Sequence, residues 1–154
     1  MPPRVVAAIV ERLRALGCWQ VCLDDTTGSG APGTVGTLLR TCLTQAPMHT
    51  LAYQFHDTFG LATANVMEAL GQCIRAFDSS ISGLGGNPYF PGAAGNLATE
   101  ELIYLMDGLG LDCGINLDGL LLAAEYIDCM LERRTESRVG RALRARTLPP
   151  RQLR

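Results

Sequence analysis

Apolar residues recur along this chain at two spacings, one typical of amphipathic helices and one of short buried strands. Over Pro3–Leu16 they recur every three or four residues, which predicts a helix that ends before Gly17. Short apolar runs bounded by turn residues predict three strands, at Trp19–Leu23, His49–Phe55 and Ala76–Ile81. Helical spacing also predicts helices over Pro32–Gln45, Leu61–Ile74, Leu97–Gly108 and Leu117–Arg133.

The predicted elements follow the order α-β-α-β-α-β-α-α. Alternating strands and helices predict an α/β fold, with a parallel sheet and right-handed crossovers. Each predicted strand is followed by polar or acidic residues and then by a loop that contains glycine. Because parallel strands end at the same edge, these polar residues should gather where parallel α/β folds carry their active sites.

Three strands are too few for a closed barrel. An eight-stranded barrel needs about 250 residues, and a three-stranded parallel sheet leaves two open edges. The chain is therefore either a compact open sheet or part of something larger.

The longest loop connects the third strand to the next helix, within Phe77–Glu101. It contains five glycines and two prolines, and glycine lets a ligand approach the main chain closely. Asn96 stands where a helix N-cap is expected, with Thr99 and Glu100 in the first turn. The segment is either a functional loop or a long connector made of turn-forming residues.

Composition excludes several classes of function. The net charge of −2 argues against a nucleic-acid partner, and no apolar run is long enough to span a membrane, so we expect a cytoplasmic protein. All 13 basic residues are arginine, which excludes Schiff-base chemistry by a lysine of this chain. The six cysteines form no CxxC pair and lie mostly in apolar segments, so we expect buried free thiols.

Polar side chains at the predicted strand ends are the candidates for chemistry. Period-two alternation places Gln54 and His56 on one face of their strand. Together with Asn96 they could bind Mg²⁺ or Mn²⁺, although a lone histidine is also common as an ordinary hydrogen-bonding residue. Asp25 ends the first strand and could act as a base or, equally, cap a loop.

A second candidate motif is Gly28-x-Gly30-x-x-Gly33, which imitates a dinucleotide-binding fingerprint. Pro32 interrupts it, and no acidic residue ends a following strand about 20 residues on. We therefore disfavour nucleotide binding.

Four stretches of this sequence resemble a known family: LDDTTGSGAPGT, FHDTFGLATANVMEAL, FDSSISGLGGNPY and PGAAGNLATEELIYLMDGLG. They are similar to the C-terminal portion of hydroxymethylglutaryl-CoA lyase, from about Val5 to Arg138. The resemblance implies a partial TIM barrel, with the last three β/α units followed by C-terminal helices over residues 1–136. Residues 137–154 would then form a basic, poorly ordered tail.

The resemblance also implies an activity. These lyases use a divalent metal to cleave 3-hydroxy-3-methylglutaryl-CoA to acetyl-CoA and acetoacetate. By resemblance, His56 and Asn96 match metal ligands, and Asp25 and Glu100 match acidic residues of the site. An acyl-CoA substrate and Mg²⁺ or Mn²⁺ are the implied ligands.

Three departures from the family pattern keep alternatives open. Gln54 occupies the place of a family histidine, and Asn87 occupies the place of the catalytic cysteine. The family's first-strand Asp-Arg-Glu-type motif has no counterpart in this chain. The alternatives are an inactive or truncated paralogue that needs a partner half-barrel, or a related acyl-CoA lyase or synthase. Open sheet edges predict either a homo-oligomer or a partner that supplies the missing strands.

Overall fold

A computed structural model describes residues 1–86, 92 and 94–147 of the chain. It divides into two compact units, each described by itself below. The first unit comprises residues 1–78 with 86–94, and the second comprises residues 79–85 with 95–154.

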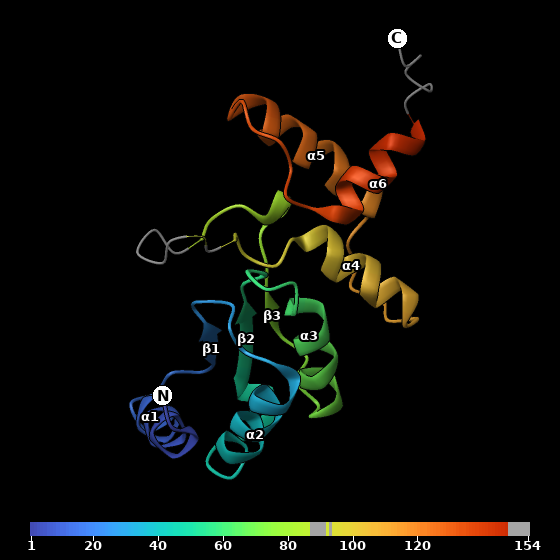
Figure 1. Ribbon diagram of the computed structural model, residues 1–154. Coiled ribbons are helices and arrows are strands. Elements are labelled where there is room, and N and C mark those ends of the chain that lie inside the picture. Colours follow the sequence, from blue (N-terminus) through green and yellow to red (C-terminus); the bar gives the residue numbers. More distant parts are fainter. Residues whose placement is uncertain (87–91, 93, 148–154) are drawn as a thin grey trace. The chain divides into compact units, whose positions relative to one another are not determined.

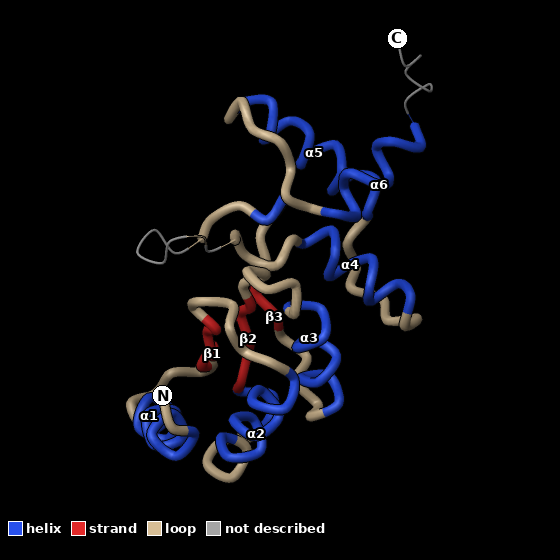
Figure 2. Tube along the Cα trace, in the orientation of Figure 1, coloured by secondary structure: helices blue, strands red, loops and turns tan. Residues whose placement is uncertain are grey.

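The first unit is a three-stranded parallel sheet with helices between its strands (Figure 1). Its strands lie in the order β1-β2-β3, coloured red in Figure 2. The predicted α/β class and parallel pairing are therefore confirmed. The elements in chain order are α1 (Pro3–Ala15), β1 (Val21–Asp25), α2 (Pro32–Cys42), the 3₁₀ turn η1 (Met48–Thr50), β2 (Leu51–Phe55), α3 (Ala62–Gly71) and β3 (Phe77–Asp78).

Apolar burial holds the first unit together. Leu39 of α2, Phe55 of β2 and Val66 of α3 are completely buried, and α2 packs against both α1 and α3. The rings of Tyr53 and Phe55 stack with their centroids 4.1 Å apart. Burying a large apolar side chain contributes about 1.5–3 kcal/mol. Packing of the helices against the sheet therefore stabilises the strands that carry the candidate residues.

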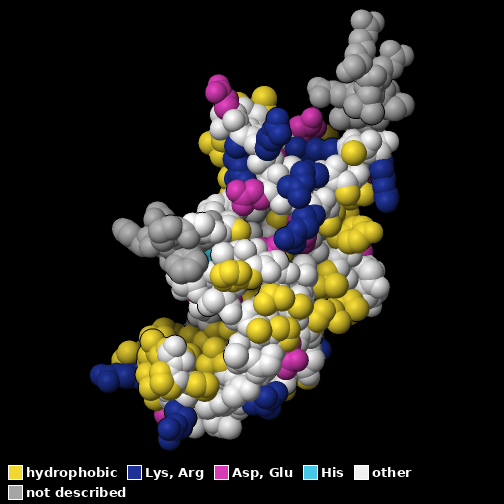
Figure 3. All heavy atoms as spheres, viewed as in Figure 1, with side chains coloured by type: hydrophobic (Ala, Val, Ile, Leu, Met, Phe, Trp, Pro, Cys, Tyr) yellow, Lys and Arg dark blue, Asp and Glu magenta, His cyan; other side chains and the backbone are white. Residues whose placement is uncertain are grey.

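A groove runs along the open edge of β1. It has a volume of about 820 Å³ and is lined by apolar residues of α1 and by residues of β1 and α2. Hydrophobic side chains gather over α1 in Figure 3, where Val5 and Ile9 are about half exposed. Among the residues that the structure describes, β1 pairs only with β2, so its other side adjoins this apolar surface.

The bounds of all three strands differ from the prediction, and β2 begins at Leu51 because Met48–Thr50 form the 3₁₀ turn η1. β1 begins at Val21 and continues to Asp25, while Trp19 lies outside it and is 78% exposed. β3 has only two residues, because beyond it Ser80 forms a parallel bridge with Ala98. Apolar runs do not show where a strand changes partner, so the sequence overestimated this strand.

The described residues of the second unit form one 3₁₀ turn and three helices. These are η2 (Ile81–Gly83), α4 (Thr99–Gly108), α5 (Leu117–Met130) and α6 (Arg138–Thr147). The predicted N-cap of α4 at Asn96 is wrong, because Ala98 occupies that position. Helix α5 does have a side-chain cap, since Asn116 accepts a hydrogen bond from the Gly119 amide at 2.7 Å.

Helix α6 lies in the segment predicted as a poorly ordered tail. Its N-terminus is held by Glu101 of α4, which accepts hydrogen bonds from the amides of Arg138 and Val139 and from the Ser137 hydroxyl. A carboxylate at a helix N-terminus satisfies unpaired amides and complements the helix dipole. This tertiary contact accounts for the helix at Arg138–Thr147, whereas residues 148–154 lie outside the described part. The domain division at residue 136 stays a prediction.

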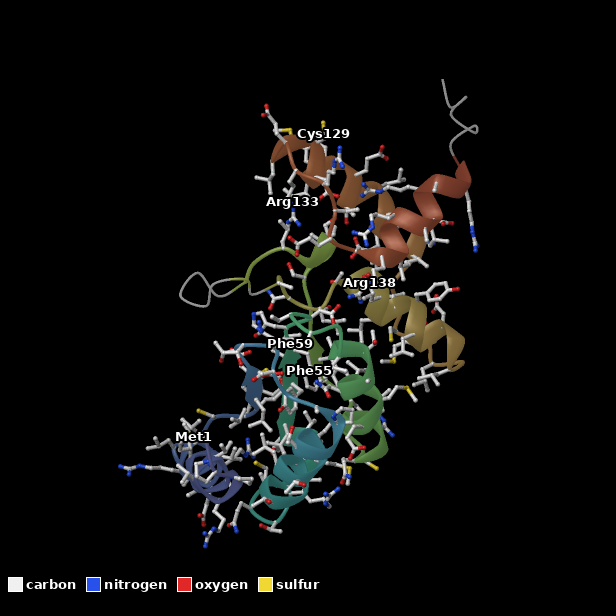
Figure 4. All side chains as sticks on the ribbon, viewed as in Figure 1. Met1, Phe55, Phe59, Cys129, Arg133 and Arg138 are labelled. Atoms are coloured by element: carbon white, nitrogen blue, oxygen red, sulfur yellow. The ribbon has the colours of Figure 1, made fainter. Side chains whose placement is uncertain are left out.

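Asp128 is the second anchor of this unit. It is 4% exposed and accepts a hydrogen bond from the Ser82 hydroxyl at 2.9 Å. Arg144 lies 3.4 Å from its Oδ2 atom, and the Nε atom of Arg133, labelled in Figure 4, lies 3.8 Å from its Oδ1 atom. One buried carboxylate thus connects η2, α5 and α6.

The predicted burial of the cysteines is wrong for five of the six. All six thiols are free, but only Cys42 is buried. Within the described residues no helix is long and apolar enough to cross a membrane.

Candidate active site

His56 and Asp25 meet at the carboxyl ends of β1 and β2. His56 is 5% exposed, and its Nδ1 atom lies 3.0 Å from the backbone carbonyl oxygen of Asp25. A carbonyl oxygen only accepts hydrogen bonds, so Nδ1 carries the proton in this contact. The other ring nitrogen, Nε2, then holds the lone pair that a metal or a proton donor would use.

The glycine loop after β1 wraps around Asp25. The Gly28 amide donates to the Asp25 carbonyl, and the Gly30 amide donates to the Asp25 carboxylate, both at 2.9 Å. Gly28 has φ +65°, and a Cβ there would lie 2.8 Å from the His56 carbonyl oxygen. Glycine is therefore required at position 28 by both conformation and space. The motif that imitated a nucleotide fingerprint instead packs around the Asp25–His56 pair.

Gln54 lies between two carboxylates, on the face of the sheet opposite to the Asp25 side chain. The strand register places it opposite Asp24 of β1 and Asp78 of β3. The neighbouring Cys22 thiol donates a hydrogen bond to the Asp78 carboxylate at 3.2 Å. Although the thiol reaches solvent, surrounding atoms remove part of its hydration, and together with Asp78 and Asp24 this raises the Cys22 pKa to about 12. Cys22 is therefore a protonated, weakly nucleophilic thiol near neutral pH.

Asn96 and Glu100 belong to the second unit. The Asn96 side-chain amide nitrogen donates to the Leu84 carbonyl at 2.8 Å, which fixes the orientation of its amide. Glu100 is completely buried, and both its carboxylate oxygens accept from the Ser82 amide, at 3.0 and 3.1 Å. Burial raises the Glu100 pKa, while the bonds from its own and the Ser82 amide partly oppose that rise. Ser82 has a φ of 54°, so Glu100 supports a residue in the left-handed region.

The structure thus brings Asp25 and His56 together in the first unit, and describes Asn96 and Glu100 in the second. Asn87 lies outside the described residues. Within residues 1–86, 92 and 94–147, no group of three or more histidine, cysteine, aspartate or glutamate side chains forms a metal site. The donor set therefore fits a divalent cation only in part, through the Nε2 atom of His56. The predicted roles of Gln54, Asn96, Asp25 and Glu100 stay predictions.

Two residues that contact His56 or the loop around Asp25 were missed by sequence reasoning. Asp24 has its Oδ1 atom 3.5 Å from the His56 Nδ1 atom. Asn65 is completely buried on α3 and donates to the Gly30 carbonyl at 2.8 Å. Its position was detectable, because it falls on the same helical face as the buried Ala62 and Ala69. A polar residue on such a face needs a buried partner.

Comparisons with known proteins agree on one family. The HMGL-like family model matches residues 1–127. Hydroxymethylglutaryl-CoA lyase of Pseudomonas mevalonii is 47% identical over 145 residues, which is 94% of this chain and 48% of that protein. The crystal structure of hydroxymethylglutaryl-CoA lyase from Pseudomonas aeruginosa matches with a TM-score of 0.91 at 40% identity, over 94% of this chain and 48% of that one.

A third similar protein is a lyase whose structure contains bound ligands. The lyase from Acinetobacter baumannii, solved in complex with coenzyme A and 3-methylmalate, matches with a TM-score of 0.85 at 32% identity. The match covers 100% of this chain and 49% of that one.

The parallel sheet and these matches show that the fold of this chain is part of a TIM barrel, as the sequence predicted. The chain belongs to the HMGL-like family. It spans about half the length of the curated relatives it matches.

Proposed function

We propose that this chain is part of a metal-dependent lyase that cleaves 3-hydroxy-3-methylglutaryl-CoA to acetyl-CoA and acetoacetate. The observation that carries the proposal is the contact between His56 Nδ1 and the Asp25 carbonyl, in a chain 47% identical to a lyase of that name. This contact directs the free Nε2 atom of His56 away from Asp25, as a metal-binding histidine requires.

The proposed chemistry divides into binding and proton transfer. A bound Mg²⁺ or Mn²⁺ would polarise the oxygens of the substrate. His56 and Asn96 are the proposed ligands from this chain, with Gln54 as a weaker third. Asp25 would remove or hold the proton of the tertiary hydroxyl, or orient the group that does so. Glu100, whose pKa is raised, would hold the segment after β3 in place through its hydrogen bonds to the Ser82 amide.

Two residues limit the activity of the chain as it stands. Gln54 and Asn87 occupy places where the family has a histidine and a cysteine, and an amide has no titratable proton near neutral pH. A general acid or base contributes a factor of about 10²–10⁴ in rate. We therefore infer that the chain keeps the fold and part of the metal site but is nearly inert. This favours a second candidate function, a non-catalytic paralogue, for the unaltered chain.

The proposed partner is the part of the barrel that this chain does not span. The groove of about 820 Å³ along β1 supports this proposal, because a parallel strand added there would cover the apolar residues of α1. Without such a partner, the open edge favours self-association into a homo-oligomer. An acyl-CoA remains the proposed substrate class, and the cytoplasmic location stays a prediction.

A chimera tests the proposal. Val5–Arg138 replaces the matching segment of the Pseudomonas mevalonii lyase, so that the rest of the barrel is present. We expect the unaltered chimera to be nearly inert in acetoacetate release. The double variant Asn87→Cys with Gln54→His should recover the activity by at least about a hundredfold, since two proton-transfer groups return.

The matched control is the double variant with His56→Ala added. It should lose the recovered activity while keeping its fold by circular dichroism. Full activity of the unaltered chimera would show that Asn87 and Gln54 are not defects. A restored chimera that folds and binds Mn²⁺ but stays inert would count against the assigned site.

A further inference from the structure

Asn65 connects the interior of α3 to the glycine loop after β1. Its side chain is completely buried, and its Nδ2 atom donates to the Gly30 carbonyl at 2.8 Å. Its Oδ1 atom has no hydrogen-bond partner among the residues that the structure describes. Burying an amide with one end unpaired is costly. The bond to Gly30 is therefore the contact for which an asparagine, rather than an apolar residue, is needed here.

The same loop residue, Gly30, also contacts Asp25. The Gly30 peptide accepts from Asn65 through its carbonyl, and its amide donates to the Asp25 carboxylate at 2.9 Å. A Cβ on Gly30 would lie 2.8 Å from the Asp25 Oδ2 atom. The fit leaves no free space between the loop and the carboxylate, so a displacement of Gly30 moves Asp25 as well.

Asp25 in turn sets the orientation of His56. Its carbonyl oxygen accepts from the Gly28 amide at 2.9 Å and contacts His56 Nδ1 at 3.0 Å. The Asp24 carboxylate is a rival acceptor for the same nitrogen, but it is farther away at 3.5 Å. The ring tautomer is decided by whichever acceptor holds Nδ1.

We propose that Asn65 is a positioning residue that, through Gly30 and Asp25, fixes the orientation and the Nδ1–H tautomer of His56. It touches neither substrate nor metal. The inference rests on the proposed function only for what Nε2 of His56 binds, because the tautomer itself can be measured without any metal.

The test uses the full chain with ¹⁵N-labelled histidine, at a pH where both imidazole rings are neutral. The chain has only two histidines, and the exposed His49 in η1 is an internal reference. Asn65→Leu keeps the volume but removes the donor. We expect the ratio of Nδ1–H to Nε2–H forms of His56 to fall about fivefold, as loss of one ordinary hydrogen bond changes an equilibrium, while His49 stays unchanged.

Three further variants make the result specific. Met67→Leu, on the exposed face of α3, should leave both histidines unchanged. Gly30→Ala, which displaces the Asp25 carboxylate without touching the α3 core, should shift His56 as Asn65→Leu does, and serves if Asn65→Leu does not fold. Asp24→Asn should leave the His56 ratio unchanged.

A folded Asn65→Leu chain with the wild-type His56 ratio would overturn the proposal. An equal or larger shift in Asp24→Asn would also overturn it, by making Asp24 the true acceptor. Titration of the wild-type chain with Mn²⁺ separates this inference from the function. A tautomer shift without selective broadening of His56 would keep the positioning role and count against the metal site.

Discussion

The interiors of the two units are stabilised by different kinds of buried side chain. In the described part of the first, the buried polar side chains are Thr50, His56 and Asn65, and each contacts a backbone carbonyl. In the second, buried polar groups include three carboxylates, those of Glu100, Glu101 and Asp128. Apolar burial has no direction and little dependence on pH. A buried carboxylate, in contrast, needs specific partners, so the second unit depends more on individual side chains.

The largest expected effect is a loss of stability that is confined to the second unit. Asp128→Ala leaves Arg133 and Arg144 without their buried partner and removes the acceptor for Ser82. Breaking a buried ion pair from one side costs about 3–5 kcal/mol. We expect hydrogen exchange to accelerate in α5 and α6 while the strands of the first unit keep their protection.

Asp107→Ala is the matched control, because Asp107 is an exposed aspartate on α4. It should change exchange little. Equal loss of protection in β1 and β2 on Asp128→Ala would show that the two units do not differ in the way described.

A second, smaller effect is the pH dependence of the second unit's stability. Burial raises the Glu100 pKa in the folded state above the value of about 4.3 expected when unfolded. Such a group stabilises the fold fully below its unfolded pKa, and that contribution is lost as pH rises through the folded pKa. Glu100→Gln does not titrate. The stability of wild type relative to Glu100→Gln should therefore be greatest in acid and decrease toward neutral pH.

Urea unfolding at a series of pH values measures this difference. Glu125→Gln, at an exposed position on α5, supplies the baseline. A wild-type advantage that grows with rising pH would contradict the expected sign.

The smallest effect concerns a surface of the first unit. Asp78→Ala removes both the hydrogen bond and the nearby negative charge that help to raise the Cys22 pKa. The thiolate fraction should rise, and alkylation of Cys22 by iodoacetamide should accelerate several-fold. Stability should change by less than about 0.5 kcal/mol, as is usual for surface substitutions.

Peptide mass spectrometry follows the reaction at each thiol, with Cys18 in the same sample as the reference. If Cys22 and Cys18 accelerate together, the variant has loosened the fold rather than released one thiol.

The features that the sequence predicted correctly depend on short-range pattern. Helical spacing located α1, α3 and α5, and strand ends placed Asp25 and His56 at the same edge of the sheet. The parallel sheet followed from the alternation of elements. The family resemblance then identified the barrel.

The features that were missed depend on contacts between distant residues. Helix α6 is held by Glu101, which is 37 residues before Arg138, and no local pattern reports that bond. β3 is short because Ser80 pairs with Ala98. The tautomer of His56 depends on a backbone carbonyl 31 residues away. Backbone acceptors carry no sequence signal, so only the fold discloses them.

The exposure of Trp19 has a consequence for optical measurements. It is the only tryptophan in the chain and is 78% exposed. An indole already surrounded by water emits at nearly the same wavelength before and after denaturation. Intrinsic fluorescence will therefore report little of the loss of this fold. The same indole lies just before β1. A partner that bound there and covered the indole would shift its emission to shorter wavelength. Trp19 fluorescence would therefore report the binding of a partner rather than folding.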